Sequence, residues 1–511
     1  MLDFAIPKSY LPVSTTFGPT AAEARPDTTA TFPTTAAIGA AARVEISVDA
    51  NTSPYQPEEQ LAGLSRRRFL HLVGLGVPVA AALAACSSSK PGGGAGTTSP
   101  GGGGGGGNGK ATYWFLNGQP QQAIREGAVK RFNAANPNGT IAYTEFQNDA
   151  YKTKIKTAIG AGQNPTIIWG WGGGGLRSYV KDGVVDDLTS WFGQNAQVKN
   201  RLFPSSFGAA TIDGKIYAMP CETVQPIVLY WNKRKFDEVG VQPPQSWGDL
   251  LDLVPKFNAK GIAPLSLGGQ SLWTNMMWLE FLFDRIGGPD VFGAVFNGQK
   301  NAWSNPDAIK ALTECQKLIK ADGFVKGFRS ITADSNADCA LLYTGKAAMM
   351  LHGSWTYGIM KQSGGDFVPG GHLGWMNFPP VEGGKGNTSD TVGNPGQYLS
   401  ISSNASEAQK TIAKKFFQTG VLDNTEVTGW IGTGGVPIVQ SASSQLSASP
   451  DADFLKFVYD VSSKANVFAQ SWDQALSPTA AATLLDTIGK LFSLAITPQQ
   501  FADTMNGTIG T

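Results

Sequence analysis

The sequence predicts an α/β protein with two lobes. From Ala111 onward, short apolar segments alternate with amphipathic segments of helical period, and this alternation is typical of a largely parallel sheet covered by helices on both faces. The chain after residue 109 is roughly 400 residues long, which is more than one hydrophobic core usually serves. Two lobes are therefore expected.

The beginning of this part predicts three strands and two helices. The strands are expected at 111–116, 140–147 and 166–169, and the helices at 121–134 and 151–161. The first helix places Ile124, Ala128 and Phe132 on one face. It is expected to end before Asn136-Pro137, because a proline disfavours helical backbone in the residue before it.

A glycine-rich run at 170–175 follows the third predicted strand. Parallel sheets bind ligands beyond the carboxyl ends of their strands. We expect the glycines at 172–175 to form a loop that lets the chain pass close to a ligand.

Further elements are expected along the rest of the chain. Short strands are predicted at 264–269 and 374–379, and an amphipathic helix at 407–419. Another helix is expected to open at Asn305-Pro306, with a polar cap and a proline in its first turn, and to end at Asp322-Gly323. The C-terminal third is predicted to be helical.

Residues 65–86 have the features of an export signal. Paired arginines precede the apolar stretch 70–85, which is too short and too rich in Gly and Ala for a permanent membrane helix. The pair Arg66-Arg67, followed by one residue and then Phe69-Leu70, resembles the twin-arginine signal, which directs the export of folded proteins.

The end of this signal resembles the lipobox of bacterial lipoproteins. The residues are Leu83-Ala84-Ala85-Cys86, and in such proteins the cysteine carries lipid and becomes the new N-terminus. Cys86 is the predicted lipidation site, which would anchor the protein at the extracellular face of the cell membrane. The alternative, a core thiol at Cys86, is disfavoured because residues rich in Ser and Gly follow it.

Two segments flank this signal. Residues 87–109 are dominated by Ser and Gly and predict a flexible tether. Residues 1–64 begin with a Thr-, Ala- and Pro-rich stretch without a periodic apolar face. We expect residues 1–64 to be disordered or to include a start-site artefact, and we place the true translation start near Val44 or Val48.

Charge and composition exclude several classes of function. The chain has 40 basic and 39 acidic residues and no basic block, so no nucleic-acid partner is expected. It has three histidines, His71, His352 and His372, and no close Cys/His spacing of the zinc kind. Neither a metal site nor a cofactor is expected.

Three cysteines follow Cys86, and at least one of them must be unpaired. Cys315 lies on a predicted apolar helical stripe and could be a buried thiol. It could equally form a disulfide with Cys339 in an oxidising compartment. The sequence leaves both alternatives open.

Four segments carry a resemblance to a known family. They read NPTIIWGW at 164–171, DGKIYAMP at 213–220, VLYWNK at 228–233 and GKAAMMLHGSW at 345–355. Over residues 110–500 the chain resembles the extracellular solute-binding proteins of carbohydrate ABC importers, the family of maltose-binding protein. The Gly-Lys at 345–346 lacks the upstream glycine and the Ser or Thr of a nucleotide-binding loop, and in this family ATP is hydrolysed by a separate subunit.

The resemblance implies an α/β periplasmic-binding-protein-like fold, in which two lobes are joined by a hinge and enclose a ligand cleft. One lobe would comprise 110–220 and about 393–437, and the other about 221–392 and 438–511, with hinges near Pro220 and Gly393. It also implies a monomer without catalytic activity that passes a sugar to the membrane-spanning permease subunits of an importer.

A sugar site needs aromatic planes for the apolar faces of a pyranose and planar polar side chains for its hydroxyls. The chain has 13 tryptophans, several of them beside glycines at predicted strand ends. The candidates for ligand contact are Trp355, Trp171, Trp273, Trp169, Gln147, Asn148, Glu222 and Asp473, with Asn117 and Gln119 as weaker ones. The alternatives are core tryptophans and solvated carboxylates. The glycine-rich run after the third strand and the tryptophan count look similar to those of binders of small plant-derived oligosaccharides such as xylobiose, which are the favoured ligands. Monosaccharides and amino sugars are the alternatives.

Two other functions are weighed against sugar capture. A secreted glycan-active hydrolase would also combine tryptophans with carboxylates, but no catalytic pair stands out. The Gly-x-Ser-x-Gly elbow of many hydrolases is absent from the sequence. A purely structural surface lipoprotein would not need tryptophans along a cleft.

Overall fold

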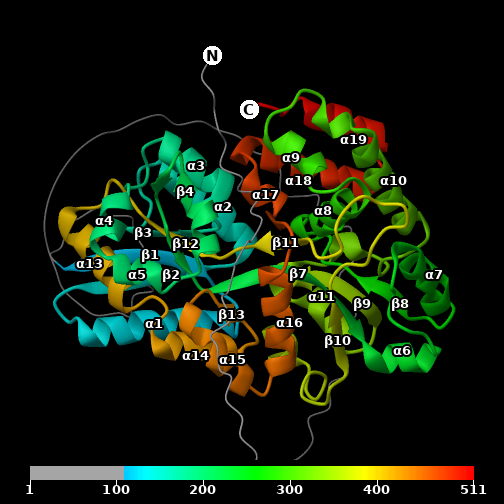
Figure 1. Ribbon diagram of the computed structural model, residues 1–511, viewed down its shortest axis with the longest axis horizontal. Coiled ribbons are helices and arrows are strands. Elements are labelled where there is room, and N and C mark those ends of the chain that lie inside the picture. The colour runs from blue at the N-terminus through cyan, green and yellow to red at the C-terminus, as the bar shows by residue number, and fades with distance from the viewer. Residues whose placement is uncertain (1–108) are drawn as a thin grey trace, which may run out of the picture. The chain divides into compact units, whose positions relative to one another are not determined.

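The computed structural model describes residues 109–511, which contain two large sheets (Figure 1) and a small one of β4 (Thr211–Ile212) and β5 (Lys215–Ile216). The first sheet has five strands, in the order β2 (Thr140–Phe146), β1 (Lys110–Leu116), β3 (Ile167–Gly170), β12 (Gln397–Ile401) and β6 (Met219–Cys221). β1 is parallel to β2 and β3, as the alternation of strands and helices predicts. β12 enters from a distant part of the chain and runs antiparallel to both β3 and β6.

Three helices beside the first sheet lie where the sequence predicts them. α1 (Gln121–Ala135) buries Ala128, Val129 and Phe132 on one face, and α2 (Asn148–Gly160) buries Tyr151 and Ile155. α13 (Glu407–Thr419) has the predicted ends, and its N-terminus is fixed by a capping box between Ser406 and Gln409.

One local prediction is wrong. The glycines at 172–175 do not form a loop, because α3 (Gly173–Lys181) begins within them. A Cβ atom at Gly172 would lie 2.4 Å from the carbonyl oxygen of Ala209, and one at Gly174 would lie 2.0 Å from that of Leu476. These glycines therefore allow α3 to pack against neighbouring backbone, and they do not approach the cavity described below.

The second sheet is built around one long strand, β7 (Thr223–Asn232). Its order is β14 (Phe468–Gln470), β11 (Thr391–Asn394), β7, β9 (Ala347–Gly353) and β8 (Ala263–Ser266), with β10 (Leu373–Met376) and β13 (Val436–Pro437) also paired to β7. The strands predicted at 264–269 and 374–379 correspond to β8 and β10.

One helix beside the second sheet is buried almost all round. α8 (Trp273–Gly287) is apolar on nearly every face, and residues 274–286 are all buried. α10 (Pro306–Lys320) and α18 (Pro478–Phe492) pack against it (Figure 1). α10 has the predicted N-cap Asn305 and proline in its first turn. α8 thus leads from its first residue, Trp273, into the core of this part of the molecule.

The chain passes between the two sheets at short connections. Glu222 is the one residue between β6 and β7, and only Pro395 and Gly396 separate β11 from β12. A third connection leads from α14 (Asn424–Gly432), which packs on α1, to β13.

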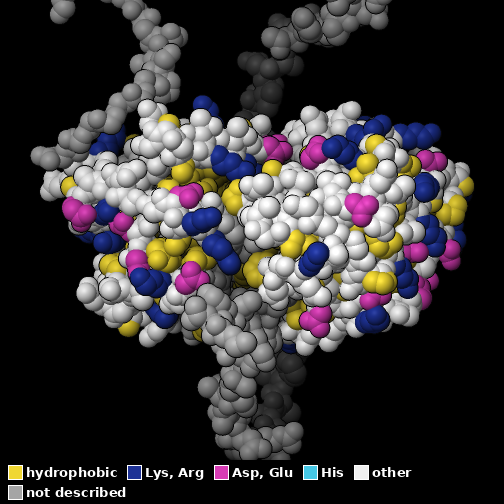
Figure 2. Space-filling model, turned by 90° about the horizontal axis from the view of Figure 1, so that it is seen from above, with side chains coloured by type: hydrophobic (Ala, Val, Ile, Leu, Met, Phe, Trp, Pro, Cys, Tyr) yellow, Lys and Arg dark blue, Asp and Glu magenta, His cyan; other side chains and the backbone are white. Residues whose placement is uncertain are grey.

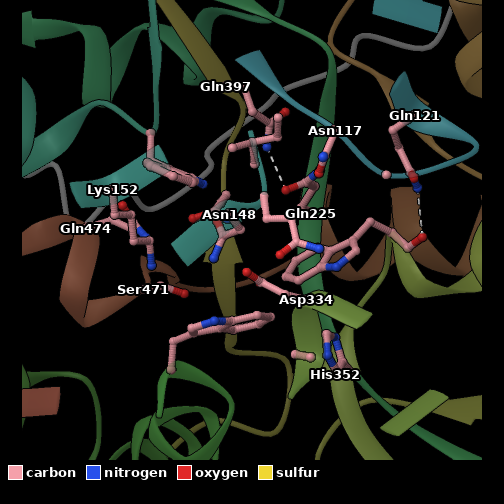
Figure 3. A pocket seen from close by; sticks show the side chains of 18 of the residues that line it. Asn117, Gln121, Asn148, Lys152, Gln225, Asp334, His352, Gln397, Ser471 and Gln474 are labelled. Atoms are coloured by element: carbon pink, nitrogen blue, oxygen red, sulfur yellow. Dashed lines mark hydrogen bonds between the residues drawn. The ribbon is translucent and has the colours of Figure 1, made fainter. Parts of the chain in front are cut away.

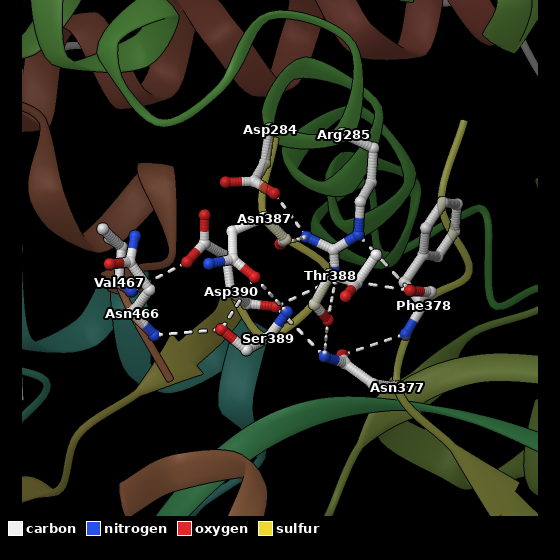
Figure 4. A network of polar contacts seen from close by, with 10 residues as sticks. All are labelled: Asp284, Arg285, Asn377, Phe378, Asn387, Thr388, Ser389, Asp390, Asn466 and Val467. Atoms are coloured by element: carbon white, nitrogen blue, oxygen red, sulfur yellow. Dashed lines mark hydrogen bonds and ion pairs between the residues drawn. The ribbon is translucent and has the colours of Figure 1, made fainter. Parts of the chain in front are cut away.

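A buried arginine ties together the starts of two strands of the second sheet (Figure 4). Arg285, on α8, is 1% exposed and donates to the carbonyl oxygens of Asp390 at 2.9 Å and Asn387 at 3.2 Å, and it also pairs with Asp284. Asp390 precedes β11, and its carboxylate accepts the backbone N–H of Val467, just before β14, at 2.8 Å. The segment 377–390 is therefore folded around one guanidinium.

Cys221, Cys315 and Cys339 are all buried and free. The disulfide between Cys315 and Cys339 that the sequence left open does not form in the structure, and Cys315 packs in the apolar core as a thiol.

The predicted export signal, Cys86 and the tether lie outside the described residues. Within residues 109–511, no helix is long and apolar enough to cross a membrane. Figure 2 shows basic and acidic side chains interspersed on the face that it presents, in keeping with the near-equal charge totals of the chain.

Candidate functional site

A cavity of about 170 Å³ lies between the elements of the two sheets (Figure 3). From the first sheet, the residues that follow β1, β2 and β3 reach it, including Asn117, Asn148 and Trp171. This is the carboxyl edge of three parallel strands, where ligands of such sheets bind. The second sheet contributes α8, the end of β9, and α17 (Trp472–Ala475).

One wall of the cavity is aromatic and belongs to the second sheet. The ring centres of Trp273 and Trp355 are 6.2 Å apart, and His352 lies edge-on to both at 5.4 Å. Gly353 makes this arrangement possible, because a Cβ atom there would lie 1.8 Å from the ring of Trp355. The glycine in the HGSW segment thus lets the indole fold back against β9.

Trp273 is placed by an unusual turn. Its backbone N–H donates to the carbonyl oxygen of Ser271 across Leu272, whose φ of 47° and ψ of −42° are those of a classic γ-turn. The hydroxyl of Ser271 in turn accepts the N–H of Ala333 at 3.1 Å. Such a backbone is rare and strained and persists where its surroundings fix it. Trp273 is therefore held in a defined position at the start of α8.

The facing wall belongs to the first sheet. The ring centres of Trp169 and Trp171 are 4.7 Å apart, and the ammonium of Lys152 lies 5.3 Å from the centre of the Trp171 ring. Trp169 is only 2% exposed, whereas Trp171 is half-buried. Trp171 therefore offers the larger surface to the cavity.

Three polar atoms of the cavity lining are buried without a hydrogen-bond partner in the described part of the chain. They are Nε1 of Trp273, Oδ1 of Asn394 and Oε1 of Gln397. The amide nitrogen of Gln397 is used within the protein, since it donates to Gln225 Oε1 at 2.6 Å (Figure 3). A buried donor or acceptor without a partner is costly. A ligand that supplies both donors and acceptors would satisfy these atoms.

The charged side chains of the cavity are largely neutralised by the protein. Arg125 pairs with Glu222 at 2.7 Å, and Lys152 pairs with Asp473 at 3.1 Å. Asp334 accepts the N–H of Asp149 at 3.1 Å, at the N-terminus of α2, where a carboxylate is favoured. Burial raises the pKa of Asp334.

The imidazole of His352 is likewise engaged on both sides. Its Nδ1 accepts the N–H of Gly353 at 2.9 Å, and its Nε2 lies 3.2 Å from Oδ2 of the buried Asp338. Both ring nitrogens therefore face the protein, and the ring serves as support for the two tryptophans.

The structure brings seven of the eight predicted site residues to this cavity. These are Trp355, Trp171, Trp273, Trp169, Gln147, Asn148 and Asp473, and the weaker candidates Asn117 and Gln119 also line it. Glu222 is not part of the lining, because it is 2% exposed and faces Arg125 and the indole N–H of Trp169. Direct contact of each residue with a ligand remains a prediction.

Several lining residues were not predicted from the sequence. Asn394 and Gln397 flank the Pro395-Gly396 connection, and Gln225 lies on β7. The sequence signal that could have identified Asn394 and Gln397 is their position as polar residues on both sides of a Pro-Gly pair. Among residues 109–511, no group of three or more His, Cys, Asp or Glu side chains could hold a metal ion.

Solved structures share this fold. One from work on xylan utilization by Caldanaerobius polysaccharolyticus is 29% identical, with a TM-score of 0.70 over 78% of this chain and 100% of that chain. A chitin oligosaccharide binding protein is 23% identical, also with a TM-score of 0.70, over 78% of this chain and 98% of its own. The chain thus has the two-lobed α/β fold of these proteins.

Curated relatives match parts of the chain. The multiple sugar-binding protein of Streptococcus mutans is 25% identical over 60% of this chain and 70% of its own length. An uncharacterized ABC transporter extracellular-binding protein of Pyrococcus horikoshii is 25% identical over 49% and 56%, and a probable sugar-binding periplasmic protein of Mesorhizobium japonicum is 28% identical over 48% and 57%. The chain spans little more than half the length of these last two relatives.

The family model for bacterial extracellular solute-binding proteins matches residues 117–420, which is more than half of the chain. The match begins directly after β1 and includes β2 to β12, and it contains most of the cavity lining. The chain therefore belongs to the family of bacterial extracellular solute-binding proteins.

Proposed function

We propose that this protein captures a sugar, favouring a small oligosaccharide, and delivers it to an ABC importer. The observation that carries the proposal is the pair of tryptophan walls with unpartnered polar atoms between them, at Trp273, Asn394 and Gln397. A pyranose has apolar C–H faces that suit indole rings and hydroxyl groups that both donate and accept hydrogen bonds. It therefore meets both requirements of this cavity.

The charge pattern supports an uncharged ligand. Arg125 and Lys152, the cationic side chains of the lining, each have a carboxylate partner within the protein. A phosphate or carboxylate ligand would have to break one of these pairs, and removing one partner of a buried pair is costly. Neutral hydroxyl groups leave both pairs intact.

The relatives support the proposed substrate class and the proposed importer. The Streptococcus mutans and Mesorhizobium japonicum proteins are named as sugar-binding, and the Pyrococcus horikoshii protein is named as part of an ABC transporter. The 29% identical solved structure comes from work on xylan utilization. Xylobiose and xylotriose are therefore the first sugars to test.

Cleft closure would use the short connections between the sheets as hinges. Residues 110–220 and about 393–437 would move as one lobe, and about 221–392 and 438–511 as the other. The single residue between β6 and β7, and the Pro395-Gly396 pair between β11 and β12, support this assignment. Few backbone dihedrals need to change at such connections.

The proposal includes export by the twin-arginine route and a lipid anchor at Cys86. A chain with Cys86→Ser should no longer incorporate labelled palmitate and should be released from cells into the medium. A variant with both Arg66 and Arg67 replaced by Lys should stay in the cytoplasm. If Cys86→Ser remained as firmly bound to membranes as the unchanged chain, the anchor would lie elsewhere.

Calorimetry tests the sugar proposal directly. The purified full-length chain is titrated with xylobiose, xylotriose, chitobiose and maltose, and the same samples are analysed for hydrolysis products. We expect binding of at least one sugar without turnover. Release of shorter sugars would favour the glycan-active hydrolase. If the chain bound none of the neutral sugars but did bind an anionic solute, the proposed substrate class would be wrong.

A further inference from the structure

Glu222 occupies a special place in the backbone, as the one residue between a strand of each sheet. Its φ is 64°, in the left-handed region that residues with a side chain seldom adopt. Its carbonyl oxygen accepts the N–H of Ile438 at 3.1 Å, just after β13. Two of the three connections between the sheets therefore meet at this residue.

The side chain of Glu222 accepts three hydrogen bonds from two residues. Nε and Nη2 of Arg125 donate to its two carboxylate oxygens at 2.8 and 2.7 Å, and Nε1 of Trp169 donates at 2.7 Å. Glu222 is 2% exposed and Arg125 is 7% exposed. Charge-assisted, bidentate hydrogen bonds fix orientation as well as position. The left-handed backbone of Glu222 is thus held in place through its own side chain.

The two residues that donate hydrogen bonds to the carboxylate of Glu222 also form part of the cavity wall, which we call the floor of the cavity. Arg125 and Trp169 both line it, and Nη1 of Arg125 donates to the carbonyl oxygen of Leu116, at the end of β1, at 3.1 Å. The guanidinium lies 5.6 Å from the ring centre of Trp169 and 5.5 Å from that of Trp430. A shift of the cavity floor would therefore act directly on the carboxylate of Glu222.

We propose that Glu222 is a hinge-positioning residue, which couples the floor of the sugar site to the angle between the two sheets. Its carboxylate, held by Arg125 and Trp169, fixes the backbone between β6 and β7 in the geometry that closes the cleft. Removing the charge would leave the hinge free to take a wider range of angles. The part of this inference that concerns affinity rests on the proposed sugar binding, whereas the part that concerns the hinge does not.

Pulsed electron paramagnetic resonance tests the hinge. Spin labels are placed at Lys156→Cys on α2 and Lys300→Cys beside α9 (Asp290–Phe296), two exposed positions on opposite sides of the cleft, in the full-length chain carrying Cys86→Ser. The remaining cysteines are buried and should not react. Without sugar, Glu222→Gln should give a broader or shifted distance distribution than the unchanged chain. Its affinity for xylobiose or xylotriose should fall about tenfold or more.

A matched control separates this role from simple loss of an ion pair. Asp423 also accepts two hydrogen bonds from an arginine of α1, Arg131, at 2.8 and 2.9 Å, but it caps the N-terminus of α14, at the opposite end of that helix from the connection to β13. Asp423→Asn should lower the melting temperature without changing the distance distribution. Glu222→Gln with a distribution and affinity equal to those of Asp423→Asn would overturn the proposal.

A second variant covers the case in which Glu222→Gln does not fold. Arg125→Lys keeps the charge but cannot donate two parallel hydrogen bonds, so it should broaden the distribution in the same way. An unchanged distribution in Arg125→Lys would count against the proposal. If the unchanged chain showed no response to any sugar, the proposed substrate would fail, while the sugar-free distances would still test the hinge.

Discussion

The ammonium of Lys152 lies 3.1 Å from Oδ2 of Asp473, and this ion pair joins α2, beside the first sheet, to α17, which follows β14 of the second. The same ammonium lies 5.3 Å from the centre of the Trp171 ring. One side chain thus spans the cleft and supports the indole on which we expect a sugar to stack.

Lys152→Met should weaken sugar binding about fivefold, or about 1 kcal/mol, because it removes an ion pair that is partly screened by solvent. The side chains are 23% and 5% exposed, so solvent reaches the lysine more than the carboxylate. The deficit should shrink in about 1 M salt, where the Debye length is about 3 Å. Calorimetry with xylotriose at low and high salt measures both effects.

Lys154→Met is the matched control, since Lys154 is an exposed residue of the same helix. It should bind sugar as the unchanged chain does. Equal losses in the two variants would show that the net charge of α2, and not the bridge to Asp473, governs affinity.

Gly353→Ala should reduce sugar affinity about as much as Trp355→Ala does, by about tenfold or about 1.4 kcal/mol. The reason is steric, because a Cβ atom at position 353 would lie 1.8 Å from the ring of Trp355 and would displace it. Affinity is measured by calorimetry, and circular dichroism checks the fold. Gly193→Ala, at a position with open space around the new methyl group, is the control. A Trp355→Ala variant of unchanged affinity would remove this ring from the site.

Local patterns were enough to predict three of the five strands of the first sheet and three of the helices beside it. The strands β1, β2 and β3 and the helices α1, α2 and α13 depend on apolar periodicity, proline and capping residues that lie within each segment. The tryptophans beside glycines at strand ends were also found in this way, because a parallel sheet brings its carboxyl ends to one edge.

Other features depend on contacts between distant segments. The carboxylate of Glu222 binds Arg125, which is 97 residues away in the sequence. The residues around Glu222 therefore could not show whether its side chain lines the cavity or lies behind the cavity wall. Gly172 and Gly174 face the backbone of segments that only the fold brings near. Asn394 and Gln397 reach the cavity because β11 and β12 belong to different sheets, which no local pattern reveals.

Stability should fall as the pH rises from about 4 to about 8. Burial raises the pKa of Glu280 to about 8 and that of Glu426 to about 7. Unfolded carboxyls lose their protons near pH 4, so over this range the folded state binds more protons than the unfolded state. The contribution of these carboxyls to the free energy of unfolding is complete below their pKa in the unfolded chain, and it is lost as the pH rises through their pKa in the folded protein. The melting temperature should therefore be about 2 °C or more lower at pH 8 than at pH 5.

Glu280→Gln should flatten this pH dependence. Oε1 of Glu280 accepts the N–H of Trp472 at 2.7 Å, and Oε2 is buried without a partner in the described chain. An amide keeps the shape and the acceptor but cannot ionise. Glu407→Gln, at a side chain that is 88% exposed, should leave the slope unchanged. A slope of equal size in both variants would assign the pH dependence to other groups.

Arg285→Met should lower the free energy of unfolding by about 3–5 kcal/mol, because it leaves the carboxylate of Asp284 without its cationic partner in the protein interior. The carbonyl oxygens of Asn387 and Asp390 each lose one donor and keep another, the N–H of Asp390 and the side-chain amide of Asn377. Urea unfolding measures the change. Sugar affinity should fall as well, because β11 begins at this network and carries Asn394 to the cavity.

The control for this variant lies in the same segment of chain. Lys385 is 67% exposed and pairs with Asp307 at 2.6 Å, and Lys385→Met should change stability by no more than about 0.5 kcal/mol. If Arg285→Met lost stability but bound sugar normally, the network would stabilise the second sheet without positioning the cavity. If Arg285→Met unfolded at the same urea concentration as Lys385→Met, the buried guanidinium would not be what holds residues 377–390 in place. The carbonyl contacts drawn in Figure 4 would then contribute little net stability.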